Sequence, residues 1–384
     1  METAALGCLI EQRSTEILNP HILFAVHSVT SHSEIPIPQL TEADVRRHLD
    51  PARVLQAIES AFRDRYPSIT IPARTHVQLA NGTFLAMACY DPSCHALGTK
   101  LVTVRRHPAP GEPSVQATYL LLDADTAQPR LIIAANYLTD LRTAVTSAIA
   151  TKYLARHDAS TLGIFGTGRL TRTHLQLLPQ VRNFQRILIC GRDPARTAAF
   201  VDEIKNDEIK NRNKNDVIPT LRKAKGRDLT SANTVTKADG TSPAADTLLR
   251  NCTIESADPR TLAAESDVLC TCTSNPTPLF DGQDLRPGTH LNLVGSFQPH
   301  TREVDTNTIA RSARIVVETY ATLSEPGDLL IPMQEGAITG DHLVADLHEL
   351  ITGKKQVRQS SEEITIFKSV GCALEDLVTA ELLR

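Results

Sequence analysis

A short glycine loop in the middle of the chain carries the clearest chemical signal. It follows an apolar stretch at 161–165 and precedes a segment with helical spacing. The residues of the loop and of the helix start that could contact a cofactor are Gly166, Thr167, Gly168, Arg169 and Leu170. The first glycine permits a tight turn, and the second lets a pyrophosphate approach the backbone at a helix N-terminus. Because a second apolar stretch follows at 187–190, the order of these segments predicts a dinucleotide-binding site.

The end of that second apolar stretch bears on which dinucleotide binds. A carboxylate at this place usually binds the ribose diol of NAD(H), whereas an arginine pairs with the 2′-phosphate of NADP(H). Here Arg192 comes first, and Asp193 follows at the start of the next predicted helix, where a capping role explains it. The sequence therefore favours NADP(H) over NAD(H), with a plain surface charge as the alternative role of Arg192.

The composition of the 384-residue chain excludes several classes of protein. Aromatic residues make up 4% and tryptophan is absent, which argues against a nucleic-acid binder that stacks bases. The formal net charge of −4 lacks the basic surplus that binding to phosphate backbones needs. No apolar run approaches the ~18 residues of a membrane span, and the first residues lack the pattern of a signal peptide. We therefore expect no nucleic acid and no membrane as partners, and a cytoplasmic location.

The cysteines do not form a pattern typical of a metal site. Cys89, Cys94 and His95 lie close together, but a fourth ligand is missing and the histidines do not follow at zinc-finger spacing. Most of the cysteines lie in apolar runs, where a buried small thiol is the usual role. We expect no metal and, in a chain of this length, a reducing compartment.

The elements before residue 139 are predicted to be two short helices and a sheet. Thr41 and Asp44 can form a capping box, and Asp50 with Pro51 can start a second helix. From 69 to 136 the pattern changes to short apolar runs separated by turn residues. This alternation is typical of a mostly antiparallel sheet.

The glycine loop lies in a second region, in which helices and strands alternate. Thr139 is predicted to cap a long alanine-rich helix that ends near residue 155, and fully apolar strands follow between 161 and 318. Such strands, separated by helices, indicate a parallel sheet covered on both faces. A polar stretch at about 206–248 interrupts the alternation and is predicted to be a solvated insertion, with a docking or regulatory loop as the alternative. Helical spacing returns at 364–383.

Eight segments of the chain occur in the same order as in a known family. They are 71–74, 84–90, 97–102, 138–144, 166–168, 287–296, 327–329 and 364–371. Together they resemble the ornithine cyclodeaminase/mu-crystallin family, from about residue 40 to residue 384 apart from the insertion. Their common order makes this likeness much more specific than the glycine loop alone.

The resemblance implies an α/β fold in which a Rossmann dinucleotide-binding domain is inserted into an α+β domain for substrate binding and dimerisation. The expected parts are 1–138 for the first part of the outer domain, 139–330 for the Rossmann domain and 331–384 for the C-terminal return. Within the first part, 1–35 is expected to be a peripheral extension. The family likeness also implies a homodimer.

The resemblance further implies a site for an amino or imino acid. It assigns the substrate to Arg74, Met87, Lys100, Arg142 and Phe297, and adds Thr143 and Ser369 to the cofactor site. Arginine side chains offer a carboxylate charge-assisted, bidentate hydrogen bonds. A lysine beside another cation has a lowered pKa, so Lys100 would move a proton to or from the substrate nitrogen.

Phe297 departs from the pattern of the cyclodeaminases. Those enzymes carry a catalytic aspartate within Gly-x-Asp-x-Pro, whereas this chain has Phe297 between Gly295 and Pro299. Phenylalanine cannot assist the proton transfers of cyclodeamination, and relatives without the aspartate, such as mu-crystallin, are ketimine reductases. The sequence therefore favours an NAD(P)H-dependent reductase of a cyclic or linear 2-imino acid, such as pyrroline- or piperideine-2-carboxylate. The alternatives are an ornithine cyclodeaminase, an alanine-dehydrogenase-like amino-acid dehydrogenase and a non-catalytic NADPH-binding protein.

Overall fold

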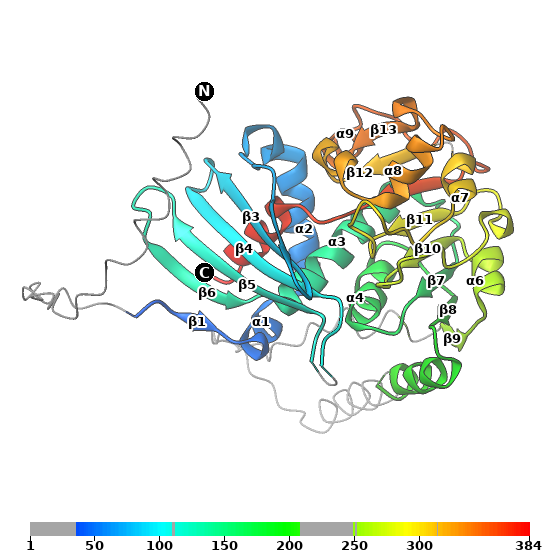
Figure 1. The fold of residues 1–384 in the computed structure, drawn as a ribbon, viewed down its shortest axis with the longest axis horizontal. Helices are drawn as coiled ribbons and strands as arrows, with labels where there is room; N and C mark the ends of the chain where they lie inside the picture. Colours follow the sequence, from blue (N-terminus) through cyan, green and yellow to red (C-terminus); the bar gives the residue numbers. More distant parts are fainter. Residues whose placement is uncertain (1–35, 110–111, 208–248, 250–251, 313) are drawn as a thin grey trace, which may run out of the picture. The chain divides into compact units, whose positions relative to one another are not determined.

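The structure, a computed structural model, describes residues 36–109, 112–207, 249, 252–312 and 314–384 (Figure 1). The predicted extension at 1–35 and nearly all of the predicted insertion at 206–248 lie outside the described residues. The chain divides into the units Met1–Pro36 and Ile37–Arg384. Every helix and strand below belongs to the second unit.

The smaller of two sheets has six strands in the order β1-β6-β5-β4-β3-β2. Their bounds are Gln39–Leu40 (β1), Thr75–Leu79 (β2), Gly82–Asp91 (β3), Ala96–Arg105 (β4), Val115–Asp123 (β5) and Pro129–Ala134 (β6). Strands β2 to β6 are antiparallel neighbours, whereas β1 pairs in parallel with β6. The antiparallel sheet predicted for 69–136 is therefore confirmed. Buried and more exposed residues alternate along β3 and β4, so one face of this sheet packs inward.

The larger sheet has eight parallel strands in the order β13-β12-β14-β11-β10-β7-β8-β9. Their bounds are Thr161–Phe165 (β7), Arg186–Cys190 (β8), Thr253–Ser256 (β9), Val268–Thr271 (β10), His290–Leu293 (β11), Arg314–Val317 (β12), Leu343–Asp346 (β13) and Thr365–Lys368 (β14). The central strands are buried along their length, which confirms the predicted parallel α/β sheet. Strand β7 lies between β8 and β10, so the strand order reverses there. Open sheets of this kind bind ligands at that switch point.

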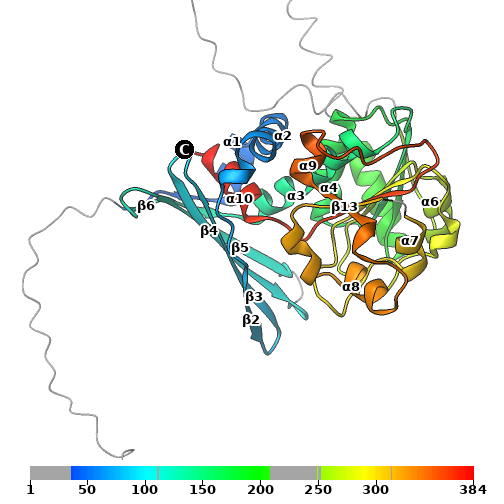
Figure 2. The same ribbon diagram turned by 90° about the horizontal axis from the view of Figure 1, so that it is seen from above.

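Helices cover both faces of the larger sheet and the inner face of the smaller one (Figure 2). Their bounds are Glu42–His48 (α1), Pro51–Ser60 (α2), Asn136–Leu154 (α3), Arg169–Leu177 (α4), Pro259–Glu265 (α6), Thr306–Arg311 (α7), Gly327–Gln334 (α8), Leu347–Ile351 (α9) and Ala373–Glu381 (α10), and 194–207 is also helical. The predicted capping box of Thr41 with Asp44 and the predicted cap of Asp50 are both present. Among the described residues, no helix has the length and apolar character needed to cross a membrane.

Helix α3 connects the two sheets, because it contacts β5 of the smaller sheet and β11 and β14 of the larger one. The prediction that Thr139 caps this helix is wrong, since α3 begins at Asn136 and its N-cap is Ala135. The Thr139 hydroxyl donates to the backbone carbonyl of Ala135 at 2.8 Å. The side chain of Asn136 instead accepts the backbone N–H of Ala117 in β5, at 2.8 Å, and ties the helix start to the sheet. Most of α3 is buried, so it carries Arg142 into the interior.

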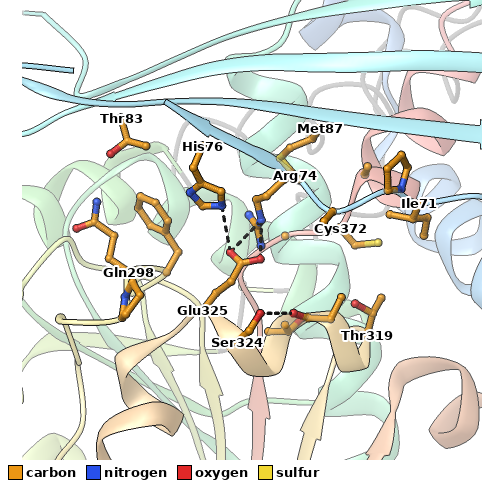
Figure 3. A pocket seen from close by; sticks show the side chains of 18 of the residues that line it. Ile71, Arg74, His76, Thr83, Met87, Gln298, Thr319, Ser324, Glu325 and Cys372 are labelled. Atoms are coloured by element: carbon orange, nitrogen blue, oxygen red, sulfur yellow. Dashed lines mark hydrogen bonds and ion pairs between the residues drawn. The ribbon is translucent and has the colours of Figure 1, made fainter. Parts of the chain in front are cut away.

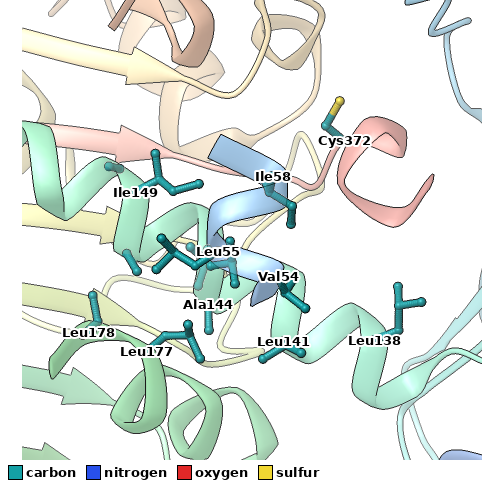
Figure 4. Close-up of a cluster of buried hydrophobic side chains, with 14 of the residues drawn as sticks. Val54, Leu55, Ile58, Leu138, Leu141, Ala144, Ile149, Leu177, Leu178 and Cys372 are labelled. Atoms are coloured by element: carbon teal, nitrogen blue, oxygen red, sulfur yellow. The ribbon is translucent and has the colours of Figure 1, made fainter. Parts of the chain in front are cut away.

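The core around α3 consists of aliphatic side chains, as the absence of tryptophan and the low aromatic content require. Figure 4 shows where α2, α3 and α4 pack together. The side chains that it labels on these helices and just after α4 are Val54, Leu55, Ile58, Leu138, Leu141, Ala144, Ile149, Leu177 and Leu178, and all are buried. Burying one Val, Leu or Ile side chain in this way stabilises the fold by about 1.5–3 kcal/mol.

The C-terminal segment, predicted as one helix over 364–383, forms two elements. Strand β14 inserts between β11 and β12, and α10 follows after Cys372. All residues of β14 are buried, so its apolar residues show no alternation that would distinguish a strand from a helix.

The predicted ends of the Rossmann domain also do not coincide with the elements. Strands β13 and β14 belong to the larger sheet, so a boundary at 330 is too early. A start at 139 falls inside α3. Helix α10 packs against β3 and β4 and is the element that returns to the smaller sheet.

Candidate active site

The glycine loop links β7 to α4, and its conformation depends on Gly166 and leaves open space at Gly168. Gly166 has a φ of +117°, and a Cβ on it would lie 2.5 Å from the carbonyl oxygen of Cys272, so any side chain there is strained. Gly168 is the N-cap of α4, is exposed, and has open space where a Cβ would lie. No side chain caps the first turn of this nine-residue helix. The space and the uncapped N–H groups therefore fit a pyrophosphate.

The other residues predicted around the loop hold it in place. A Cβ on Gly191, just after β8, would lie 2.9 Å from Cγ2 of Thr167, so the loop packs on the neighbouring strand end. Arg169 pairs with Asp140 of α3 at 2.7 Å. Burial raises the pKa of Asp140 to about 6, although the Arg169 charge opposes this shift. Leu170 packs against the hydrophobic core.

Two charged residues follow β8, where the sequence favours NADP(H). The carboxylate of Asp193 accepts two backbone N–H groups of the following helix, at 2.9 and 3.2 Å, so its predicted capping role is confirmed. The side chain of Arg192 is exposed. Its contact with a cofactor phosphate stays a prediction.

A cavity of about 700 Å³ lies beside the smaller sheet (Figure 3). Arg74, Met87 and Phe297, all predicted to bind substrate, are among the residues that line it. The guanidinium of Arg74 donates through Nε to Glu325 at 2.9 Å, and His76 Nε2 lies 3.8 Å from the same carboxylate. Figure 3 shows these three side chains converging in the cavity wall.

Lys100 and Arg142 meet on one buried carboxylate. Lys100 lies on β4 opposite Met87 of β3, and its Nζ donates to Oδ1 of Asp376 at 2.9 Å. Arg142 donates through Nε to the same Oδ1 at 3.0 Å and through Nη1 to Glu375 at 2.9 Å. Both acids belong to the first turn of α10, and all four side chains are buried.

Gly371 separates the cavity from these buried groups. It lines the cavity, and a Cβ on it would lie 2.6 Å from both terminal nitrogens of Arg142. Its φ of +86° is a second reason for glycine at this place. The structure therefore brings Lys100 and Arg142 together directly behind the cavity wall, and it places Arg74 in that wall.

Burial and neighbouring charges shift the pKa values of this cluster. Burial first, and the Arg142 guanidinium second, lower the pKa of Lys100 to about 8. Although burial lowers the pKa of Arg142, Asp376 and Glu375 raise it above its ordinary value. Burial, followed by the nearby Glu318 carboxylate, raises the pKa of Glu375 well above its ordinary value. Lys100 is thus the group of this cluster that is poised to exchange a proton near neutral pH.

Thr143 and Ser369, predicted for the cofactor site, are engaged with neighbouring protein groups. The hydroxyl of Thr143 donates to the backbone oxygen of Thr139 at 2.8 Å, in the middle of α3. The hydroxyl of Ser369 donates to Glu318. Neither residue lines the cavity, and their contact with a cofactor stays a prediction.

The acids that hold the three cations were not predicted from the sequence. Glu375 and Asp376 lie in a segment that was interpreted through its apolar spacing, and Glu325 lies just before the segment 327–329 that resembles the family. Two acids at the start of a helix are common, because they interact favourably with the helix dipole. Their spacing therefore gave no sign that they reach the smaller sheet.

The predicted absence of a metal site concerned Cys89, Cys94 and His95. Within the described ranges, no group of three or more histidine, cysteine, aspartate or glutamate side chains is arranged to hold a metal ion. Cys94 lies 3.6 Å from Nη1 of Arg65, and Cys89 is buried.

Known proteins of one family resemble this chain in sequence and in fold. The model of the ornithine cyclodeaminase/mu-crystallin family matches residues 39–246 and 233–384. The chain belongs to this family. The likeness to the ornithine cyclodeaminase/mu-crystallin family stated from the sequence is therefore confirmed.

Individual members of the family resemble most of the chain. A Delta(1)-pyrroline-2-carboxylate reductase of Bacillus cereus is 32% identical over 316 residues, which cover 81% of this chain and 84% of that protein. The reductase of the same name from Thermococcus litoralis, solved in complex with NADH and L-proline, is 30% identical with a TM-score of 0.77, over 90% of this chain and 96% of that one. An archaeal alanine dehydrogenase dimer with bound NAD is 25% identical with a TM-score of 0.75, over 90% and 94%.

Proposed function

We propose that this chain is an NAD(P)H-dependent reductase of cyclic or linear 2-imino acids, with Δ1-pyrroline-2-carboxylate as the representative substrate. One observation carries the proposal. Lys100 and Arg142 share the buried carboxylate of Asp376, directly behind a cavity whose wall holds Arg74. Two guanidinium groups suit a carboxylate, and one ammonium group suits a nitrogen that must gain a proton. The resemblance to the two pyrroline-2-carboxylate reductases supports this choice of substrate.

The substrate carboxylate is held by Arg74 and Arg142. Arg74 exchanges its ion pair with Glu325 for the substrate, as both carboxylates suit the same guanidinium face. Arg142 is reached past Gly371, where a side chain would block the approach. The two contacts fix the orientation of the imine relative to Lys100.

Lys100 supplies the proton. A reduced nicotinamide, when bound at the glycine loop, supplies the hydride that adds to the imine carbon. As the C=N bond becomes single, the nitrogen takes a proton from Nζ of Lys100 and the product is an amino acid. Asp376 holds the ammonium group in place for this transfer, at 2.9 Å. The pKa of Lys100, lowered to about 8, makes the proton easier to release.

Phe297 favours reduction over cyclodeamination. It lines the cavity at the place where the cyclodeaminase pattern has an aspartate. A phenyl ring excludes water and carries no proton, so it suits a reaction in which the imine must not be hydrolysed.

We further propose that NADP(H) is preferred. The carboxylate of Asp193 is occupied in capping, whereas the exposed guanidinium of Arg192 is available for a 2′-phosphate. The structural relatives named above contain NADH or NAD, so the proposal of NADP(H) rests on Arg192 of the present chain alone.

We also propose that the chain acts as a homodimer that pairs through the outer face of the smaller sheet. Register places Phe84 and Tyr90 of β3 and Leu97 and Leu101 of β4 on the face opposite Lys100. Tyr90 and Leu101 are 39% and 38% exposed. A band of apolar side chains on a sheet face marks an interaction surface, and the alanine dehydrogenase that resembles this chain is a dimer.

The experiment that tests the function is a substrate panel with each reduced and oxidised dinucleotide. We expect oxidation of NADPH with Δ1-pyrroline-2-carboxylate and formation of proline. Release of ammonia from ornithine without imine reduction would instead identify a cyclodeaminase. Oxidation of NADH that needs pyruvate and ammonia would identify an amino-acid dehydrogenase, and binding without turnover would identify a cofactor-binding protein.

A further inference from the structure

A buried carboxylate joins the ends of two central strands of the larger sheet. Glu303 is fully buried, and its Oε2 accepts the hydroxyl of Thr271, at the end of β10, at 2.7 Å. Its Oε1 accepts the backbone N–H of Thr273 at 3.0 Å and the hydroxyl of the same residue at 2.5 Å. On the other side, Oε2 accepts the backbone N–H groups of Gly295 and Ser296, just after β11, at 2.8 and 3.1 Å. One carboxylate therefore fixes both strand ends to each other.

A buried ion pair, Lys368 with Asp328, also contacts Ser296 and Glu303. Lys368, at the end of β14, donates through Nζ to Asp328 at 2.8 Å and to the backbone oxygen of Ser296 at 2.6 Å. Asp328 in turn accepts the backbone N–H of Glu303 at 2.7 Å. The side chain of Ser296 donates to the backbone oxygen of Thr301 at 2.6 Å. The N–H, the carbonyl and the hydroxyl of Ser296 are all engaged, so this residue is held in one position.

The next residue is Phe297, which lines the cavity. We propose that Glu303 is a positioning residue: by fixing Gly295 and Ser296, it sets the place of the Phe297 ring in the wall of the substrate cavity. This inference rests on the proposed function, since it assigns the ring to the imino-acid site. Glu303 itself does not line the cavity and so acts through its neighbour.

The contacts of Glu303 require a carboxylate rather than an amide. Each of its two oxygens accepts at least two hydrogen bonds, and every partner is a donor. In Glu303→Gln, an NH₂ group at the place of Oε2 faces the backbone N–H groups of Gly295 and Ser296, and one at the place of Oε1 faces that of Thr273. Either orientation sets a donor against a donor and loosens the connection between the two strand ends. Gly295 matches this arrangement, because a Cβ on it would lie 2.4 Å from Glu303 Oε1 and 2.5 Å from Oε2.

The first test is a double-mutant cycle on imine reduction. Glu303→Gln alone is expected to lower kcat/KM roughly tenfold, mainly through a higher KM for the imino acid. In the Phe297→Ala background the same change is expected to have an effect of less than about twofold, since the ring that it positions is gone. Equal effects in both backgrounds, or no effect in either, would overturn the inference. The control is Glu59→Gln, another buried glutamate, which accepts from Lys152 and Tyr153 on α3 and is expected to leave KM unchanged.

The second test does not depend on activity. The chain has no tryptophan, so Phe297→Trp introduces a single fluorescent reporter at the place in question. Adding Glu303→Gln is expected to raise quenching of this reporter by acrylamide, and adding Glu59→Gln is not. If the wild-type chain reduces no imino acid but the reporter responds as stated, the proposed function fails while the positioning by Glu303 stands. If imine reduction is found and the reporter does not respond, the positioning inference fails alone.

Discussion

Among single residues, Asp376 organises the candidate site. Its carboxylate bonds both Lys100 and Arg142, which approach from different elements. Removing one partner of a buried ion pair typically lowers the free energy of unfolding by about 3–5 kcal/mol, because the remaining charge is buried without a counter-charge or water. The cluster therefore depends on this acid for stability as well as for the orientation of the lysine.

The sequence predicted the cations of the site but not the acids. Arg74, Lys100 and Arg142 could be assigned because each lies in a segment that resembles the family. Glu375 and Asp376 lie in a helix whose apolar spacing predicts a buried face but does not say which sheet it packs against. Only the long-range return of α10 to β4 brings them to Lys100.

The lowered pKa of Lys100 predicts the pH dependence of the reaction. The protonated form donates in imine reduction, so kcat should be level below the pKa of about 8 and fall as the pH rises through it. Oxidation of proline needs the neutral form and should rise over the same range. In Lys100→Arg the side chain stays protonated, so the falling limb should disappear. Rate–pH profiles in both directions check this, and a limb near pH 8 that persists in the variant would assign it to another group.

Arg192 should determine the preference for NADP(H). A charge-assisted hydrogen bond contributes about 1.5–3 kcal/mol, so Arg192→Ala should weaken NADPH binding roughly 10–100-fold. Binding of NADH should change by less than about twofold, because it has no 2′-phosphate. Dissociation constants from nucleotide fluorescence measure both. Equal losses for the two nucleotides would mean that Arg192 acts on the loop rather than on the phosphate.

At the scale of elements, the sequence predicted correctly those strands whose hydrophobic pattern fits a strand and not a helix. Strands β7 and β8 were predicted residue by residue or nearly so, since a short apolar run before a glycine loop fits a buried strand. The run at 364–371 was predicted to be helical but contains strand β14, because a strand buried on both faces shows no alternation of apolar and polar residues. Strand β2 was missed for a different reason: it is a five-residue edge strand whose residues are all exposed, and it has only two apolar residues, Val77 and Leu79.

The glycine loop gives a prediction at this scale, because its two glycines serve different purposes. Gly166→Ala places a Cβ against a carbonyl oxygen at a positive φ, so it should lower the Tm with or without nucleotide. Gly168→Ala adds a Cβ in open space and should leave the Tm of the nucleotide-free chain unchanged. It should still weaken nucleotide binding by about tenfold or more, as the Cβ occupies the space assigned to the pyrophosphate. Thermal melts and nucleotide titrations on both variants check the difference, and normal binding by Gly168→Ala would move the pyrophosphate elsewhere.

For the compact unit as a whole, α3 is the element that joins the two sheets. It carries Asp140 toward the glycine loop and Arg142 toward the cavity, two residues apart on one buried helix. The nucleotide site and the substrate site are therefore fixed to the same rigid element. From the order of its segments, the sequence predicted two domains. The boundary between them could not be placed correctly at residue 139, because this residue lies inside α3 and α3 packs against both sheets.

The proposed homodimer interface on the outer face of the smaller sheet can be tested by a single substitution. Leu101→Glu places a charge in the proposed apolar interface, where burial without a partner is costly. Light scattering on the native chain should give twice the mass of one 41.9 kDa chain, and the variant should give the mass of one chain. Tyr320→Ala, which removes an exposed aromatic side chain outside this sheet, serves as the control. A dimer that survives Leu101→Glu would place the interface elsewhere.

The central claim, that this site protonates and reduces an imine, is tested most directly by comparing the native chain with Lys100→Met. The measurement is proline formed from Δ1-pyrroline-2-carboxylate and NADPH under saturating cofactor. The native chain should form proline in step with NADPH oxidation, and Lys100→Met should lower kcat by roughly 10²–10⁴ while it still binds NADPH. Proline formation by the variant at the native rate, or none by the native chain, would contradict the account.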